Sequence, residues 1–485
     1  MKPNLNKYFE YVSFKPFKPK PFDYDKAIEE AQKLTFLLKP SSIESKALIE
    51  RLLVILKPEV GKRGKLSLKF INALELTIPM LLKAAGEDEG GYVYRSTATS
   101  RFTCGLPGNE TATGITVGHE PFKRVTDDLA REGFLEVVTG YKECHAPVSS
   151  RGVATRFKAT SKLIGLAIAH NVHPEFWEHH FGSIPRPVRV ADPIRLKAKS
   201  KKEWRYNKDK KQGKMAKNKG ISLLVDYSLP HVAAYAEGVN GLNTFMARQD
   251  IQPAHLYHSF FRVFGDGDKD GADYSKGGRI YAYGIGKGYQ NVRKHIRRRM
   301  TISGEAIAEV DLRASYLTIL YRRLGYQLPS DDPYTMPDVP RHIVKMWVSA
   351  NLGKGKLLTK WPDALVKKYK EDSDDEQGDL RAEHPIKATG QTIMKHLPIM
   401  KEWSEAPIGW GDLQLTESTV VMAAVTKLAF VHGVPALPLH DALMVPESKA
   451  DLAAKVLWES FHEHVGIYPY ISINRHERAE MRLAA

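Results

Sequence analysis

The N-terminal part of the chain contains two stretches in which apolar residues recur every three or four positions, over 24–57 and 66–85. In the first stretch the spacing is carried by Leu48, Leu52, Leu53 and Leu56. This period predicts amphipathic helices, and the breaker GEDEGG at 86–91 ends the second one. We therefore predict a small helical region over residues 1–90.

From residue 91 the pattern changes to short strands and helices. The segment PFKRVTDDLAREGFLEVV predicts a helix that ends at Gly133, and VATRFKATSKLIGLAIAH predicts a strand that becomes helical after Thr160. One face of the first helix carries Phe122, Val125, Leu129 and Phe134. Helix, strand, basic turn and strand is the layout of a winged helix, in which one helix enters the major groove of DNA and the wing touches phosphates. A winged helix can also dock a protein, so over 91–190 both interpretations stay open.

The remaining chain divides into a basic stretch with helical pieces at 221–264 and a long alternation of strands and helices over 266–485. We therefore predict an α+β fold. In EVDLRASYL, alternating apolar residues predict a strand that carries Asp311 at its end, followed by a helix. In VPALPLHDALMVP, two apolar strands flank His440 and Asp441 and predict a tight hairpin with a carboxylate at its tip.

Charge indicates a polyanionic partner. The formal net charge is +16, and residues 195–220 alone carry twelve Lys or Arg against Glu203 and Asp209. Such an excess favours nucleic acid through phosphate neutralisation, although a solvated linker is the alternative for this segment. A second basic cluster is formed by Arg293, Lys294, Arg297, Arg298 and Arg299.

Other classes of protein are disfavoured. The chain has only two cysteines, Cys104 and Cys144, too few for a disulfide scaffold or a cysteine-rich zinc module. It contains no apolar run long enough to cross a bilayer and no signal-peptide pattern, so we predict a cytoplasmic protein without a membrane partner.

Two carboxylates at strand ends, Asp311 and Asp441, suit a pair of Mg²⁺ ions about 4 Å apart, for which Mn²⁺ can substitute. Between them, RHIVKMWVSANLGKGK places Arg341 and Lys345 four residues apart and hence on one helical face. Two cations placed in this way suit a triphosphate, and Lys345 could protonate the departing pyrophosphate. An exposed helix face is the simpler alternative.

Two further elements carry polar side chains. In DYSKGGRIYAYG, two glycines precede Arg279 and a short strand with Tyr281, so the arginine could hold a template or primer phosphate. In GDLQLTESTVVMAAVTKLAF, an apolar helix carries Gln414 and Glu417 on one turn, directly before the His-Asp hairpin.

These motifs, in this order, resemble the superfamily of family A DNA polymerases and single-subunit phage-type RNA polymerases. GGRIYA resembles its glycine-arginine motif, EVDLRASYL its motif A, RHIVKMWVSANLG its motif B and PLHDALMV its motif C. The resemblance covers roughly residues 270–465, and the whole chain is similar to plasmid and phage proteins that join a winged-helix region to such a palm. It implies a right-hand fold with palm and fingers over 266–485, and a basic linker with thumb-like helices over 191–265.

The resemblance also implies roles for individual residues. Asp311 and Asp441 would bind the metal ions, Lys345 and Arg341 the incoming nucleoside triphosphate, and His440 the primer end. Contacts with DNA template and primer would come from Arg279, Tyr281, Gln414, Arg297, Arg298 and Arg299. The sequence departs from motif B, because Ser349 and Gly353 occupy positions where an aromatic residue normally stacks on the base.

The choice of sugar depends on the residue five positions after the motif A aspartate, which is Tyr316. A bulky residue here crowds a 2′-hydroxyl in the DNA enzymes, so the resemblance favours a DNA-directed DNA polymerase. Three alternatives stay open: an RNA polymerase or primase, favoured by GGRIYA; a replication initiator with an inactive palm; and a nuclease, disfavoured by the two cations.

Overall fold

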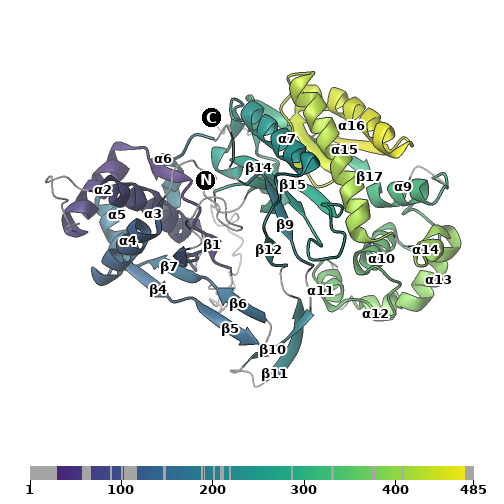
Figure 1. Cartoon of the computed structure of the whole chain (residues 1–485), viewed down its shortest axis with the longest axis horizontal. Helices are drawn as coiled ribbons and strands as arrows, with labels where there is room; N and C mark the ends of the chain where they lie inside the picture. Colours follow the sequence, from purple (N-terminus) through teal and green to yellow (C-terminus); the bar gives the residue numbers. More distant parts are fainter. Residues whose placement is uncertain are drawn as a thin grey trace, which may run out of the picture.

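The computed structural model describes residues 30–56, 67–87, 90–99, 102, 117–145, 149–186, 189–190, 192–199, 202–207, 212–217, 220–285, 288–328, 332–372, 378–406 and 408–475. The fold is α+β, as predicted. Its buried apolar side chains form two clusters: one drawn from Leu34 to Ile184 together with Ile285, the other from Ile194 to Val465. Figure 1 shows the corresponding parts side by side.

The first part packs helices around a four-stranded sheet of order β1-β3-β7-β4. Phe122 is fully buried in the core of this part and contacts Phe36 and Phe157 at ring-centroid distances of 5.5 and 5.7 Å. The elements are β1 (Gln32–Lys33), β2 (Leu38–Pro40), α2 (Ile43–Leu56), α3 (Leu68–Glu87), β3 (Tyr92–Arg95), α4 (His119–Arg131), β4 (Leu135–Val138), β5 (Tyr141–His145), β6 (Ser149–Val153), β7 (Thr155–Ala159), α5 (Ser161–Ala169), α6 (Trp177–His180) and β8 (Phe181–Ser183).

The predicted order of helix, strand, turn, strand and helix is confirmed over 119–169. Helix α4 is followed by Gly133 in the left-handed region, with φ +73°, and α5 starts at Thr160, whose hydroxyl accepts from the Leu163 amide. The turn is the antiparallel hairpin β5–β6. The side chains of this hairpin, including Cys144, and the whole of Cys104 lie outside the described residues.

The helix predicted over 24–57 is wrong over residues 30–42. Residues 24–29 lie outside the described part, and the short strands β1 and β2 precede α2, which begins only at Ile43. Pro40 ends β2, and the Ser42 hydroxyl accepts from the Ser45 amide at 3.1 Å, which caps the helix at this point.

The second part contains a four-stranded sheet and a six-stranded sheet. One has the order β12-β9-β14-β15, and the other runs β13-β16-β17-β19-β18 with β20 added to β17. Their strands are β9 (Ile194–Lys197), β12 (Ser222–Leu223), β13 (Ile251–Gln252), β14 (Ser259–Phe264), β15 (Gly277–Tyr283), β16 (Thr301–Ile302), β17 (Glu305–Arg313), β18 (Leu437–Leu439), β19 (Ala442–Pro446) and β20 (Tyr470–Arg475). A separate hairpin is formed by β10 (Lys202–Asn207) and β11 (Gln212–Lys217), whose side chains lie outside the described part of the basic stretch.

Helices cover these sheets and extend to one side of them (Figure 1). The long α15 packs on both β15 and α16. The helices are α7 (Pro230–Met246), α8 (Lys294–Arg297), α9 (Ser315–Arg323), α10 (Arg341–Lys354), α11 (Asp363–Asp372), α12 (Leu380–Glu383), α13 (Ile386–His396), α14 (Ile399–Trp403), α15 (Trp410–Phe430) and α16 (Ala450–Val465). Among the described residues, no helix is long and apolar enough to cross a membrane.

The helical pieces predicted over 221–264 are confirmed for α7 and for a short 3-10 helix, Ala254–Leu256, but not for the rest of the stretch. The end of this stretch, Ser259–Phe264, is strand β14, which pairs antiparallel with β15. Its residues SFFRVF are buried mainly on every second position, which is the period of a strand and not of a helix.

The two parts meet through polar contacts as well as through Ile285. The Arg186 guanidinium donates to the carbonyl oxygens of Gln249 and Ile251 at 2.6 and 3.0 Å. The rings of Trp177 and His255 lie edge to face, with centroids 5.1 Å apart. The first part is therefore joined to the sheets that carry the predicted site.

Candidate active site

Strand β17 and the β18–β19 hairpin bring Asp311 and Asp441 together. The antiparallel register sets Asp311 opposite Ala442, and the Leu312 amide donates to the Asp441 carbonyl oxygen at 3.2 Å. His440 lies in the turn of this hairpin, and its backbone adopts the left-handed conformation with φ +62°. The predicted hairpin is thus confirmed, and it places Asp441, in the turn just before β19, next to the strand β17 that carries Asp311, 130 positions away in the sequence.

The two carboxylates repel each other. Burial, and then the negative charge of Asp441, raise the pKa of Asp311 to about 7, while Lys345 acts in the opposite direction. Glu309 and Glu417 add smaller increases. The positive charge of Lys345 on α10 therefore favours the ionised form of Asp311.

The pair suits a hard divalent cation. Among the described residues, no group of three or more His, Cys, Asp or Glu side chains is placed to hold an ion. Mg²⁺, however, is commonly bound by one or two carboxylates and completes its shell with water and substrate phosphates. A partly buried carboxylate with a second carboxylate beside it, such as Asp311 with its raised pKa, is also a site where a cation relieves like-charge repulsion. Asp311 and Asp441 are the residues that would hold it.

Arg279 lies in an interaction network beside this pair. Its guanidinium donates to the Glu417 carboxylate at 2.6 and 3.3 Å and to the Tyr316 hydroxyl at 2.6 Å. The Glu417 side chain is 1% exposed and that of Arg279 17%. Burial raises the pKa of Glu417, and the nearby guanidinium opposes this increase. The positive charge of Arg279 is therefore largely engaged by a buried carboxylate.

Tyr316 is held from two sides. Its hydroxyl accepts from Arg279, and its ring lies edge to face with Trp410, with centroids 4.4 Å apart. Burial, followed by the charge of Glu417, raises the pKa of the Tyr316 hydroxyl, which stays protonated. A side chain fixed in this way can exclude a substituent from the space in front of it.

Helix α10 presents Arg341 and Lys345 on an exposed face, as its sequence predicted. Arg341 donates to the Asp332 carboxylate at 2.7 Å and lies 5.8 Å from the centre of the Tyr334 ring. Tyr334 is buried, and burial together with the charge of Asp441 raises its pKa. Asp332 and Tyr334 thus both contact Arg341 at the start of α10, and Tyr334 lies within the electrostatic influence of Asp441.

The residues predicted to contact primer or template are spread over several elements. Desolvation and the charges of Arg279 and Arg297 lower the pKa of His440, although Asp441 opposes them. Arg297 lies 3.9 Å from Glu309 and is mostly covered, whereas Arg298 and Arg299 are exposed. Arg297 therefore lies close to the hairpin tip, and the other two face solvent at the end of α8.

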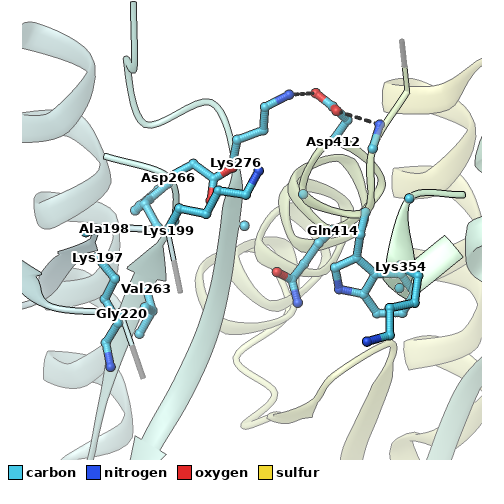
Figure 2. Close-up of a pocket in the computed structure, with 18 of the residues that line it drawn as sticks. Lys197, Ala198, Lys199, Gly220, Val263, Asp266, Lys276, Lys354, Asp412 and Gln414 are labelled. Atoms are coloured by element: carbon cyan, nitrogen blue, oxygen red, sulfur yellow. Dashed lines mark hydrogen bonds and ion pairs between the residues drawn. The ribbon is translucent and has the colours of Figure 1, made fainter. Parts of the chain in front are cut away.

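Gln414 and Tyr281 line a cleft of about 570 Å³ next to this network (Figure 2). The cleft lies between the sheet that contains β9, β14 and β15 and the facing ends of α10 and α15. Trp410 belongs to its wall and also contacts Tyr316. The cleft and the carboxylate pair are therefore neighbouring parts of one region.

Some residues of this region were not predicted from the sequence as site residues. These are Glu417, Trp410, Tyr334, Asp332 and Glu309. A charged residue within the apolar helix α15 was the one local indication for Glu417. Trp410 and Tyr334 gave no such indication, because aromatic residues are usual in any core.

No model of a known protein family matches the chain, and no curated protein is similar to it in sequence. The resemblance to polymerases therefore depends on the sequence motifs.

Proposed function

We propose that the chain is a template-dependent nucleotide polymerase that transfers a nucleotide from a deoxynucleoside triphosphate to a 3′-hydroxyl. One observation carries the proposal: β17 and the β18–β19 hairpin bring Asp311 and Asp441 together, with Lys345 close to them. In this interpretation β17 to β20 belong to a right-hand palm, and α10 to α14 to the fingers.

Two divalent cations, when bound, would activate the 3′-hydroxyl and neutralise the triphosphate. The 3′-oxygen attacks the α-phosphorus and its proton passes to solvent water, while the bond from the α-phosphorus to the α–β bridging oxygen breaks and pyrophosphate leaves. Lys345 and Arg341 neutralise the triphosphate from the exposed face of α10, and Lys345 supplies a proton to the departing pyrophosphate. A nuclease has no triphosphate for these cations to hold, so their presence favours nucleotidyl transfer.

Tyr316 supports the use of deoxynucleotides. Arg279 and Trp410 fix its side chain, and a fixed ring at this position would crowd a 2′-hydroxyl. The N-terminal part, with its order of helix, strand, hairpin, strand and helix, would act as a winged helix that binds DNA near the start of synthesis. Such a protein would replicate a phage or plasmid-like element.

Primer extension tests the proposal directly. The full chain is incubated with a primed single-stranded template, Mg²⁺ or Mn²⁺, and either dNTPs or NTPs, with unprimed template in parallel. We expect extension with dNTPs that is abolished in Asp311→Asn and Asp441→Asn but retained in Asp338→Asn, a change at an exposed acid just before α10.

The other results each identify a competing function. Extension with NTPs alone, or synthesis without a primer, would identify an RNA polymerase or primase. Shortening of the template without extension would identify a nuclease. If no synthesis occurs and Asp441→Asn binds DNA as well as the wild type, the palm serves only as a scaffold in a replication initiator.

A further inference from the structure

The cleft beside the carboxylate pair carries a surplus of positive charge. Lys197 and Lys199 lie on one wall and Lys354 on the other, while Lys276 reaches across the rim toward Asp412 (Figure 2). The four lysines face two aspartates in the lining, Asp266 and Asp412. Lys276 forms an ion pair with Asp412, so this aspartate is already neutralised. The lining is therefore suited to an anion.

The cleft is also unusually free of side chains. Seven of its nineteen lining residues are glycines: Gly220, Gly265, Gly277, Gly353, Gly355, Gly409 and Gly411. A Cβ atom added at Gly265 or Gly353 would meet no heavy atom within 4 Å. Close packing therefore does not require glycine at these two positions, and neither has the positive φ that favours it. What their missing side chains provide is open space for a ligand backbone.

Aromatic rings complete the lining. Tyr281 on β15 lines the cleft. Trp410, the first residue of α15, also lines it and contacts Tyr316 with 4.4 Å between ring centroids. Basic grooves with aromatic side chains are typical of sites for single-stranded nucleic acid, where lysines meet phosphates and rings stack on bases. The contact between Trp410 and Tyr316 also leads from this cleft toward the carboxylate pair.

We propose that this cleft binds the sugar-phosphate backbone of a single-stranded nucleic acid. Pockets of about 300–1,000 Å³ hold one drug-sized ligand, so this volume suits a single strand better than a duplex. That the strand leads to Asp311 and Asp441 rests on the proposed function, but the binding itself does not. The alternative ligand with the same phosphate chemistry is a free triphosphate. The test below distinguishes this ligand from a single strand.

The test measures binding without synthesis. A fluorescent oligo(dT) of twenty nucleotides is titrated with the full chain in EDTA, without nucleotides, and followed by anisotropy at several salt concentrations. The cleft variants are Gly353→Glu and Lys354→Glu. The matched controls are Gly353→Ala, which keeps the position small and uncharged, and Lys360→Glu, which makes the same charge change at an exposed lysine outside the cleft.

We expect each cleft variant to weaken binding at least tenfold at low salt and each control to stay within twofold of the wild type. The slope of log affinity against log salt should decrease by about 0.7 for each phosphate that the variant no longer neutralises. If a glutamate variant does not fold, as judged by circular dichroism, Lys354→Ala provides the same comparison with a smaller loss.

Equal affinity of the cleft variants and the wild type would overturn the proposal. It would also fail if tripolyphosphate, at equal phosphate concentration, displaced the oligonucleotide as effectively as unlabelled oligo(dT), since the cleft would then hold a triphosphate. Cleft-dependent binding without any primer extension would count against the polymerase and not against the cleft. Normal primer extension together with binding that does not depend on the cleft would count against the cleft and not against the polymerase.

Discussion

The buried ion pair between Arg279 and Glu417 provides a test of the geometry that does not depend on activity. We consider the single changes Arg279→Met and Glu417→Met and the double change. Each methionine keeps an unbranched side chain of similar length but removes one charge. A single change leaves the other charge buried without its partner, whereas the double change removes both charges.

The size of the effect follows from burial and distance. The contacts between the two groups are 2.6 and 3.3 Å long, and Glu417 is 1% exposed. Breaking a fully buried pair costs about 3–5 kcal/mol. Because Arg279 is 17% exposed, some solvent reaches it, and we expect each single change to cost about 2–4 kcal/mol. The double mutant should lie within about 1 kcal/mol of the wild type, since an apolar replacement of a buried pair is often neutral.

Urea unfolding followed by tryptophan fluorescence measures these differences. Of the seven tryptophans, six lie in the second part of the chain: Trp204, Trp347, Trp361, Trp403, Trp410 and Trp458. The emission therefore reports mainly on the part that holds the pair. These values imply a coupling free energy of at least about 3 kcal/mol from the double-mutant cycle. Additive effects of the two single changes would refute the buried pair.

Three further predictions concern the same region. Tyr316→Ala should lower the preference for dNTPs over NTPs in single-nucleotide incorporation at least tenfold, while Tyr316→Phe keeps most of it; an unchanged ratio in Tyr316→Ala would remove the proposed role in sugar choice. The pKa of Asp311, raised to about 7, means that the folded chain holds a proton more tightly than the unfolded chain, so this stabilisation is complete below about pH 4 and is lost as pH rises through 7. Without metal, the melting temperature of the wild type should therefore fall more steeply from pH 6 to 8 than that of Asp311→Asn, and parallel curves would contradict the raised pKa. Leu443→Ala should cost about 2–5 kcal/mol in the same urea assay because Leu443 is 0% exposed in β19, and a cost below about 1 kcal/mol would mean that β19 is not part of the core.

Local patterns were sufficient for several elements. Apolar alternation on both sides of His440 and Asp441 predicted the β18–β19 hairpin, and the period of RHIVKMWVSANLG predicted α10 with Arg341 and Lys345 on one face. The same reasoning was wrong over 30–42 and 259–264, where Pro40 and the pairing of β14 with β15 decided the structure. Short apolar segments fit either a helix or a strand, and only their neighbours select between them.

Some features of the candidate site could likewise be predicted from the sequence, and others could not. From the sequence by itself, Asp311 and Asp441 can be placed at strand ends and Tyr316 at the start of a helix, because each depends on a few adjacent residues. Only the tertiary structure decided that Arg279 is engaged by Glu417, that Trp410 supports Tyr316, and that lysines from both sides of a cleft face each other. These contacts join residues from tens to more than a hundred positions apart. They depend on strand register and helix packing, which no local pattern of hydrophobic and polar residues encodes.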